Sequence, residues 1–331
     1  MKRRTFLELA AASAATIAAP SIVRAQSKKL KVGYLHTLAV DGQIWLADSM
    51  GLWKKNGLDP EFIQFQTGLE LFQAMSGGSI DVLSTGAVLS NFPARGQGKA
   101  FLINNVEFAT AQLWVHPDMG INSFADLKGK KISTTAGTTA HVFLDKALRA
   151  NDIDPKKDVQ IVNQRMQDAV TAFISKAVPA VALWVPFNIS VRTRVPEAKM
   201  LVDASKYYPD AAITGGWAAG NEFFEKNPDT LKRIISTWVV ANDHLINNTD
   251  ESLKLIQEKY YPRVPLSDIK EQYQAQKMFL SPEWAKMYKD GTVTQWLQQV
   301  TDFFVDFAKI PNAVPASKYF DPSLYLDIVK A

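Results

Sequence analysis

Apolar and polar positions follow two alternating periods between residues 30 and 220. Short runs rich in β-branched and aromatic residues predict strands. Between these runs, apolar residues such as Leu46, Met50 and Trp53 recur at helical spacing and predict amphipathic helices. We expect strands at residues 30–35, 61–65, 80–83, 112–116, 130–134, 159–162, 180–184 and 212–217. Strands that alternate with helices indicate an α/β fold whose sheets are mainly parallel.

The pattern becomes wholly helical from Pro228 onward. Leu231, Ile234 and Trp238 share one predicted helical face, and a later run of aromatic and aliphatic residues around Trp296 shares another. We expect these faces to be core positions that cover the first sheet.

The stretch from residue 126 to 148 combines a turn, a strand and the start of a helix. Gly129 suits a turn that needs positive φ, and apolar residues after Thr138 predict a helix with Thr138 as its N-cap. The N-terminus of that helix offers unpaired N–H groups, to which Thr138, Thr139 and His141 add side-chain donors. This arrangement predicts a site for a small anion, although a strand, loop and helix of this kind also occur in proteins without one.

Two further loops follow predicted strands, at residues 36–43 and 84–87. Ligands of open α/β sheets bind just beyond the carboxyl ends of the strands. The candidate binding residues in these loops are His36, Thr37, Gln43, Ser84, Thr85 and Gly86. Helix capping is an alternative role for Ser84 and Thr85, and for Asp41, which could instead pair with a ligand ammonium group.

Several motifs occur in an order that resembles the nitrate/sulfonate/taurine family of periplasmic substrate-binding proteins. They are Gly-Leu-Trp-Lys-Lys-Asn-Gly-Leu at 51–58, Ser-Gly-Gly-Ser-Ile-Asp at 76–81, Asp-Leu-Lys-Gly-Lys-Lys-Ile at 126–132, Gly-Thr-Thr-Ala-His at 137–141, Val-Gln-Ile-Val at 159–162 and Ala-Leu-Trp-Val-Pro-Phe at 182–187. The resemblance implies a type II periplasmic-binding-protein fold with two α/β lobes. Each lobe is then a mixed, mainly parallel sheet flanked by helices, and two hinge crossings join the lobes.

Placed on this sequence, the resemblance implies that residues 26–115 and 213–331 form lobe 1 and residues 116–212 form lobe 2. The crossings are expected at Trp114 and near Gly215 and Gly216. Trp184, Gly216 and Trp217 are expected to complete the binding site opposite the loops of lobe 1, with core packing as the alternative for both tryptophans. The chain departs from the family pattern at residues 176–180 and at Val185, where the family usually has glutamate, which puts the ligand in doubt.

Residues 1–25 have the features of a signal peptide, with a twin-arginine-like pair at Arg3 and Arg4 and cleavage expected after Ala25. Removing this segment leaves 33 Lys and Arg against 32 Asp and Glu, a net charge of about +1. So small a charge gives no indication of nucleic-acid binding. We expect a periplasmic protein.

The sequence lacks the residues that most catalytic and metal-binding sites need. The chain has no cysteine, and its four histidines do not fall at metal-ligand spacing. No nucleophile elbow or phosphate-binding loop is present. Two enzymes of the resembled fold, an aromatic-sulfinate desulfinase and a pyrimidine synthase, belong to families that depend on cysteines. We therefore expect no catalytic residues, no metal and no cofactor.

The resulting expectation is a monomeric receptor of an ABC importer. It would capture a small organic anion, such as a sulfonate, taurine, nitrate or a carboxylate, and deliver it to an inner-membrane permease and its ATPase. A receptor for a neutral pyrimidine or flavin precursor is one alternative. An exported enzyme that uses His36 or His141 is the other.

Overall fold

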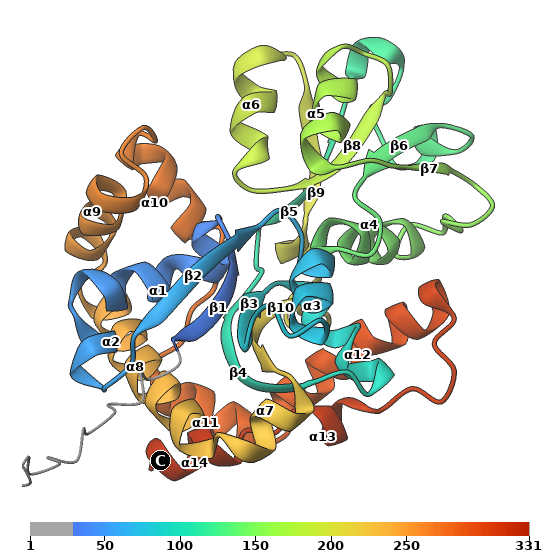
Figure 1. The fold of residues 1–331 in the computed structure, drawn as a ribbon. Coiled ribbons are helices and arrows are strands. Elements are labelled where there is room, and N and C mark those ends of the chain that lie inside the picture. The colour runs from blue at the N-terminus through green and yellow to red at the C-terminus, as the bar shows by residue number, and fades with distance from the viewer. Residues whose placement is uncertain (1–28, 331) are drawn as a thin grey trace, which may run out of the picture.

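The computed structural model describes residues 29–330, so the expected signal peptide lies outside the described residues. The described chain forms two lobes, each built on one five-stranded mixed sheet (Figure 1). We call residues 29–106 and 214–330 lobe 1, and residues 111–203 lobe 2. The segments 107–110 and 204–213 connect them. The two-lobed, mixed α/β architecture expected from the sequence is confirmed.

The sheet of lobe 1 has the strand order β2-β1-β3-β10-β4. Its strands are β1 (Leu30–Leu35), β2 (Pro60–Phe65), β3 (Val82–Thr85), β4 (Lys99–Val106) and β10 (Thr214–Ala219). β1 pairs in parallel with β2 and β3, whereas β10 is antiparallel to both β3 and β4. Four of the five strands therefore run in one direction.

The sheet of lobe 2 repeats this arrangement with the order β7-β6-β8-β5-β9. Its strands are β5 (Ala111–Val115), β6 (Lys131–Thr134), β7 (Gln160–Asn163), β8 (Ala180–Trp184) and β9 (Lys199–Asp203). β6 pairs in parallel with β7 and β8, and β5 is antiparallel to β8 and β9. The sequence pattern missed β4 and β9.

The first crossing between the lobes differs from the expected one. Trp114 lies inside β5, which pairs with β8 and β9 of lobe 2 rather than ending lobe 1. The chain instead crosses at residues 107–110, where it leaves β4, and returns through residues 204–213. The expected boundary at residue 115 was wrong because a buried apolar strand carries no sign of which sheet it joins.

Helices flank both sheets (Figure 1). Those of lobe 2 are α4 (Thr139–Arg149), α5 (Met166–Ile174) and α6 (Phe187–Arg194). Those of lobe 1 are α1 (Leu38–Ser49), α2 (Leu52–Lys55), α3 (Gly68–Ser76), α7 (Asn221–Lys226), α8 (Pro228–Asn247), α9 (Thr249–Tyr260), α10 (Leu266–Gln274), α11 (Ser281–Lys289), α12 (Thr292–Ala308), α13 (Ala316–Tyr319) and α14 (Ser323–Ile328). Short 3-10 turns are η1 (Ala87–Ser90), η2 (Pro93–Arg95), η3 (Pro117–Met119), η4 (Ala125–Leu127) and η5 (Ala204–Tyr207).

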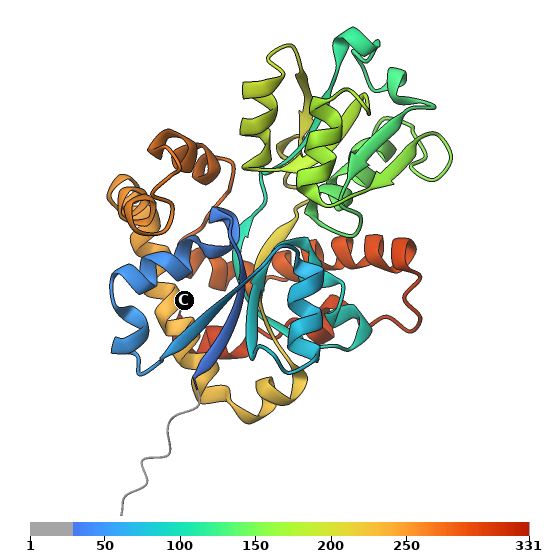
Figure 2. The ribbon, with the colours of Figure 1, turned by 45° about the horizontal axis from the view of Figure 1, so that its top comes forward.

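The carboxyl-terminal helices bury apolar faces, as the helical spacing predicted. Leu231, Ile234 and Trp238 of α8 and Trp296 of α12 are all buried. In two views α12 lies along the underside of lobe 2, next to α4 (Figures 1 and 2). Lobe 1 therefore reaches past the crossing segments and contacts lobe 2 from below.

Interactions between neighbouring residues define where α3 and β6, which lie beside the gap between the lobes, begin. Thr67 and Glu70 form a capping box that begins α3, since each side chain accepts a hydrogen bond from the other's backbone N–H at 3.3 Å. Gly129 adopts φ of 76° in the turn before β6, as expected.

Candidate functional site

A pocket of about 240 Å³ lies between the lobes, and we call it the interlobe pocket. Its walls come from the segments that follow β1, β2 and β3 in lobe 1 and β6, β7 and β8 in lobe 2. These six strands pair in parallel within their sheets, so their carboxyl ends meet at this gap. Open α/β sheets bind ligands at this edge.

His36 and Thr37 line the pocket after β1. The His36 ring stacks on Tyr261 at 4.3 Å between ring centroids, and burial lowers the pKa of His36. Its Nδ1 lies 3.7 Å from Oδ2 of the buried Asp41. Asp41 does not cap α1, because Thr37 holds the N-cap position and both Asp41 carboxylate oxygens accept from the Tyr261 hydroxyl at 2.7–2.8 Å. His36 therefore contributes an aromatic ring to the wall of the pocket.

Thr85 and Gly86 line the pocket after β3. The Thr85 hydroxyl is buried and has no partner within residues 29–330. A buried hydroxyl without a partner is costly, and a polar group of a ligand could satisfy it. At Gly86, a Cβ atom would lie 2.5 Å from Oε1 of Glu107 and 2.6 Å from Oγ1 of Thr139. The absence of a side chain lets the two lobes approach each other here.

The start of α4 forms the facing wall, where Thr138 and Thr139 line the pocket. Thr138 holds the N-cap position, but its hydroxyl donates to the Thr135 carbonyl at 2.7 Å instead of accepting from the helix. The His141 N–H donates to the Thr138 carbonyl at 3.0 Å, so the N–H groups of Thr139 and Ala140 are the ones left without an acceptor in the helix. The Thr139 hydroxyl accepts from the Ala87 N–H at 3.1 Å and donates to Glu107 at 3.4 Å. Thr139 thus connects lobe 2 to lobe 1.

Glu107, in the first crossing segment, places a carboxylate in the wall of the pocket. It is 6% exposed, and its backbone N–H donates to Ile213 in the second crossing segment at 2.7 Å. Oε2 accepts from the Thr110 hydroxyl at 2.5 Å, and Oε1 accepts from Thr139. Burial raises the pKa of Glu107, and the two hydroxyl groups oppose that shift.

The outer part of the pocket carries the opposite charge. Arg165 lines it after β7, and Trp184 lines it after β8 with its ring edge-on to Phe187. Gln167 donates to Gln66 across the gap at 3.3 Å. The ionisable side chains in the lining are His36, Glu107 and Arg165, and burial raises the pKa of Glu107 and lowers that of His36. The pocket combines an acidic inner wall with a basic outer one.

Seven of the twelve candidate residues line the interlobe pocket, and they are His36, Thr37, Thr85, Gly86, Thr138, Thr139 and Trp184. The other five, Gln43, Ser84, His141, Gly216 and Trp217, lie outside its lining. Each of these five residues is held outside the pocket by contacts with segments that are distant in the sequence.

Gln43 and Ser84 are used inside lobe 1. Gln43 donates to the Asn104 carbonyl at 3.3 Å, and Ser84 donates to the Val40 carbonyl at 2.7 Å. Trp217 lies in the core beside Trp53 and is 1% exposed. A Cβ atom on Gly216 would lie 2.3 Å from the Leu102 carbonyl oxygen, so this glycine lets β10 pack against β4.

His141 turns away from the pocket and packs edge-on against Phe303 and Phe307 of α12. Its Nδ1 accepts from the Gly137 N–H at 3.0 Å, so this nitrogen is used within the α4 start and does not donate to a ligand as expected. Burial lowers the pKa of His141 to about 4, which leaves the ring neutral at ordinary pH.

The sequence analysis missed Glu107, Arg165, Gln66 and Gln167. The strand-end rule was applied to only two strands of lobe 1, although β2 and β7 were also predicted. Extending it would have found Gln66, Arg165 and Gln167. Glu107 follows β4, which the pattern had not identified.

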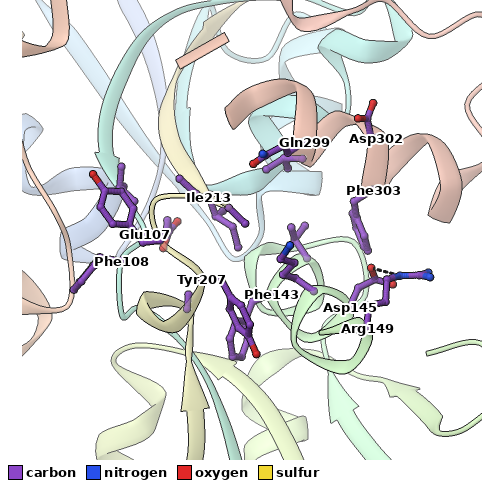
Figure 3. Close-up of a pocket in the computed structure, with 18 of the residues that line it drawn as sticks. Glu107, Phe108, Phe143, Asp145, Arg149, Tyr207, Ile213, Gln299, Asp302 and Phe303 are labelled. Carbon is purple, nitrogen blue, oxygen red and sulfur yellow. Dashed lines mark hydrogen bonds and ion pairs between the residues drawn. The ribbon is translucent and has the colours of Figure 1, made fainter. Parts of the chain in front are cut away.

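A second, larger pocket of about 380 Å³ lies between α4 and α12, and we call it the rear pocket (Figure 3). Phe143, Tyr207, Ile213 and Phe303 supply much of its apolar lining. Glu107 lines both pockets, but its hydrogen-bond partners Thr110 and Thr139 line only the interlobe pocket. Strand ends and small polar donors converge on the interlobe pocket, which is the better candidate site.

Within residues 29–330, no group of three or more acidic, histidine or cysteine side chains is placed to hold a metal ion. No helix in that part of the chain is long and apolar enough to cross a bilayer.

Comparison with known proteins shows the family of this chain. The model of the NMT1/THI5-like family matches residues 42–252, well over half of the sequence. The chain belongs to this family. It is 32% identical over 320 residues to the Brucella abortus protein named "Putative binding protein BAB2_1146", covering 97% of this chain and 98% of that one.

Solved structures show the same fold for this NMT1/THI5-like protein. The periplasmic aliphatic sulphonate-binding protein SsuA of Escherichia coli matches with a TM-score of 0.72 and 22% identity, covering 90% of this chain and 99% of SsuA. The periplasmic nitrate-binding protein NrtA of Synechocystis matches with a TM-score of 0.66 and 13% identity, covering 91% and 89%. The expected resemblance to the nitrate/sulfonate/taurine family is confirmed.

Proposed function

We propose that this chain is the substrate-binding protein of an ABC importer and captures a small organic acid between its lobes. The observation that carries the proposal is the convergence of six parallel strand ends, three from each lobe, on one pocket. A ligand there contacts both lobes at once. It therefore stabilises the arrangement in which the lobes lie together.

The start of α4 and Arg165 support an acidic ligand. The free N–H groups of the first turn favour a negative charge, and Arg165 offers a guanidinium to a carboxylate or sulfonate. The unpartnered Thr85 hydroxyl adds a buried polar contact. Aliphatic sulphonate binding by SsuA, with the same fold, agrees with this ligand class.

The proposal includes export to the periplasm, cleavage after Ala25, and release of the ligand to a membrane permease. It also includes binding without turnover. The polar side chains that line the pocket are hydroxyls, amides, His36, Arg165 and the buried acid Glu107, and His36 stacks on Tyr261 rather than on a second catalytic group. Recovery of a bound compound unchanged, measured by mass spectrometry after prolonged incubation, tests this point. Detection of a converted product would show that the protein is an enzyme rather than a receptor.

A thermal-shift screen tests the function directly. Ligand at about 100 times its dissociation constant stabilises the folded state by about 2.7 kcal/mol, which raises the unfolding midpoint by several degrees. Sulfonates, carboxylates, nitrate and pyrimidines should be compared with Arg165→Ala and with Arg194→Ala, a control outside the pocket. If no compound raises the midpoint, or if Arg165→Ala leaves the rise unchanged, the proposal that an acid binds in this pocket is wrong.

A further inference from the structure

The rear pocket has no part in the proposed function, although both lobes contribute to its lining. Its walls come mainly from α4 of lobe 2, α12 of lobe 1 and the two crossing segments. Its volume of about 380 Å³ lies within the range of small-molecule sites, which are mostly apolar with a few placed polar groups. The lining of this pocket therefore indicates what it could bind.

Aromatic rings from four segments form much of the wall. Phe143 of α4 and Phe303 of α12 both border the space (Figure 3). Phe108 and Tyr208, one from each crossing segment, pack edge-on with their ring centroids 5.5 Å apart. Nζ of Lys277 lies 5.6 Å and 5.4 Å from the centroids of these two rings and attracts both. The aromatic lining is thus fixed by contacts within the protein.

Gln299 of α12 supplies the lining with a hydrogen-bond acceptor that has no partner. The nitrogen of its side-chain amide donates to the Asp210 carbonyl in the second crossing segment at 2.8 Å. The oxygen of the same amide, Oε1, is buried and accepts no hydrogen bond within residues 29–330. A buried acceptor without a partner is costly, and a donor on a ligand would satisfy it.

The charged side chains of the rear pocket do not favour a charged ligand. Asp145 pairs with Arg149 at 2.8 Å, and Asp306 pairs with Lys156 at 2.7 Å. Burial raises the pKa of Glu107, whose two oxygens accept from hydroxyls of the interlobe pocket. The other two charged side chains in the lining are exposed and opposite in sign, and they are Lys146 and Asp302. An uncharged ligand therefore suits this lining best.

We propose that the rear pocket binds an uncharged aromatic molecule with a hydrogen-bond donor, such as a phenol or an indole, and that this molecule favours the closed arrangement of the lobes. The rings of the lining pack against the rings of the ligand. The donor of the ligand bonds to Oε1 of Gln299. The rear pocket is a second site, so this inference goes beyond the proposed function.

The position of the crossing segments explains the effect on the lobes. Glu107 of the first crossing segment lines both pockets, so the crossing segments lie between them. A rotation about these segments that separates the lobes at the interlobe pocket brings α4 and α12 closer at the rear pocket. A molecule that fills the rear pocket opposes this rotation. It therefore stabilises the arrangement in which Gln167 bonds to Gln66 across the interlobe gap.

Isothermal titration with two matched probes tests the site. Indole has an N–H donor, and N-methylindole has the same rings without it. We expect indole to bind with a dissociation constant below about 1 mM, which a ligand of this size can reach in an apolar pocket. N-methylindole should bind about fivefold more weakly, because it leaves Oε1 of Gln299 without a donor. Gln299→Met should bring the two constants together, whereas Gln295→Met, at an exposed position of α12, should keep the difference.

Filling the pocket tests where indole binds and how it affects the lobes. Ala211→Trp places a ring in the rear pocket and should abolish indole binding. Ala177→Trp, at an exposed position outside both pockets, should bind indole as the unaltered protein does. Saturating indole should lower the radius of gyration of the unaltered protein and of Ala177→Trp, measured by small-angle X-ray scattering.

Several results would overturn the inference. They are no binding of indole, equal binding of the two probes, binding of indole by folded Ala211→Trp, and an unchanged radius of gyration with indole bound. The two probes and Gln299→Met decide the matter even where Ala211→Trp does not fold. Neither probe is an acid, so these results leave the proposed function of the interlobe pocket untouched, and failure of the thermal-shift screen with acids leaves the rear pocket untouched.

Discussion

The Arg192 guanidinium of lobe 2 makes two hydrogen bonds to the Glu271 carboxylate of lobe 1, at 2.7 Å and 2.6 Å. Asn188, one turn earlier on α6, donates to the same carboxylate at 2.7 Å. α6 and α10 face each other beside the interlobe gap (Figure 1). The three side chains tie the lobes together at a point that contributes nothing to the lining of the pocket.

Removing this tie should weaken ligand binding without altering the ligand's contacts. The Arg192 and Glu271 side chains are 45% and 33% exposed, so the pair contributes at most about 1 kcal/mol. We expect Glu271→Gln to raise the dissociation constant about two- to fivefold and to increase the radius of gyration without ligand. Titration and small-angle X-ray scattering measure these effects. Glu222→Gln breaks an ion pair within lobe 1 and should change neither.

Thr139→Val tests the second connection between the lobes. The valine keeps the shape of the side chain but loses the bonds to the Ala87 N–H and to Glu107. Loss of hydrogen bonds of this kind costs about 1 kcal/mol each, so binding should weaken at least about fivefold. Thr171→Val on α5, whose hydroxyl bonds only within its own helix, is the control. Unchanged affinity would show that Thr139 plays no part in holding the lobes.

His141 predicts how stability depends on pH. Its folded pKa of about 4 lies below the ordinary value of 6.5, so the unfolded chain binds more protons between these values. The neutral ring therefore contributes stability that is full above pH 6.5 and is lost as pH falls toward 4. The contribution is on the order of 3 kcal/mol at most.

Comparison of the unaltered protein with His141→Phe isolates this effect. The raised pKa values of Asp41 and Glu107 act in the opposite direction, and they are common to both proteins. The difference in unfolding free energy between the two should shrink as pH falls from 6.5 to 4, measured by denaturant titration. A difference that is constant with pH would mean that His141 protonates in the folded protein as it does in the unfolded one.

Gly216→Ala should destabilise the fold rather than affect the pocket. The new methyl group would lie 2.3 Å from the Leu102 carbonyl oxygen, which is backbone and cannot move aside easily. Overpacking of this kind costs about 1–3 kcal/mol. Gly220→Ala, where no atom lies within 4 Å, is the control. The folded fraction of Gly216→Ala should bind ligand with unchanged affinity. An altered affinity would show that Gly216 belongs to the binding site.

Much of the fold and part of the pocket could be predicted from local pattern. The spacing of apolar residues located strands such as β1 and β6, and the strand-end rule then led to His36, Thr85 and Thr138. These predictions depend on periodicity and turn chemistry, which neighbouring residues determine. The positive φ of Gly129 could be predicted for the same reason, since it follows from the turn in which this glycine lies.

The partners of those residues were decided only by the tertiary structure. Thr139 and Glu107 are 32 positions apart, and Arg192 and Glu271 are 79 apart. The sequence by itself determined that a helix begins near Thr138 and that strands end beside it. Which hydroxyl meets a buried acid, and which way the His141 ring turns, depended on how the two sheets and α12 pack together, because contacts between distant segments leave no mark in local spacing.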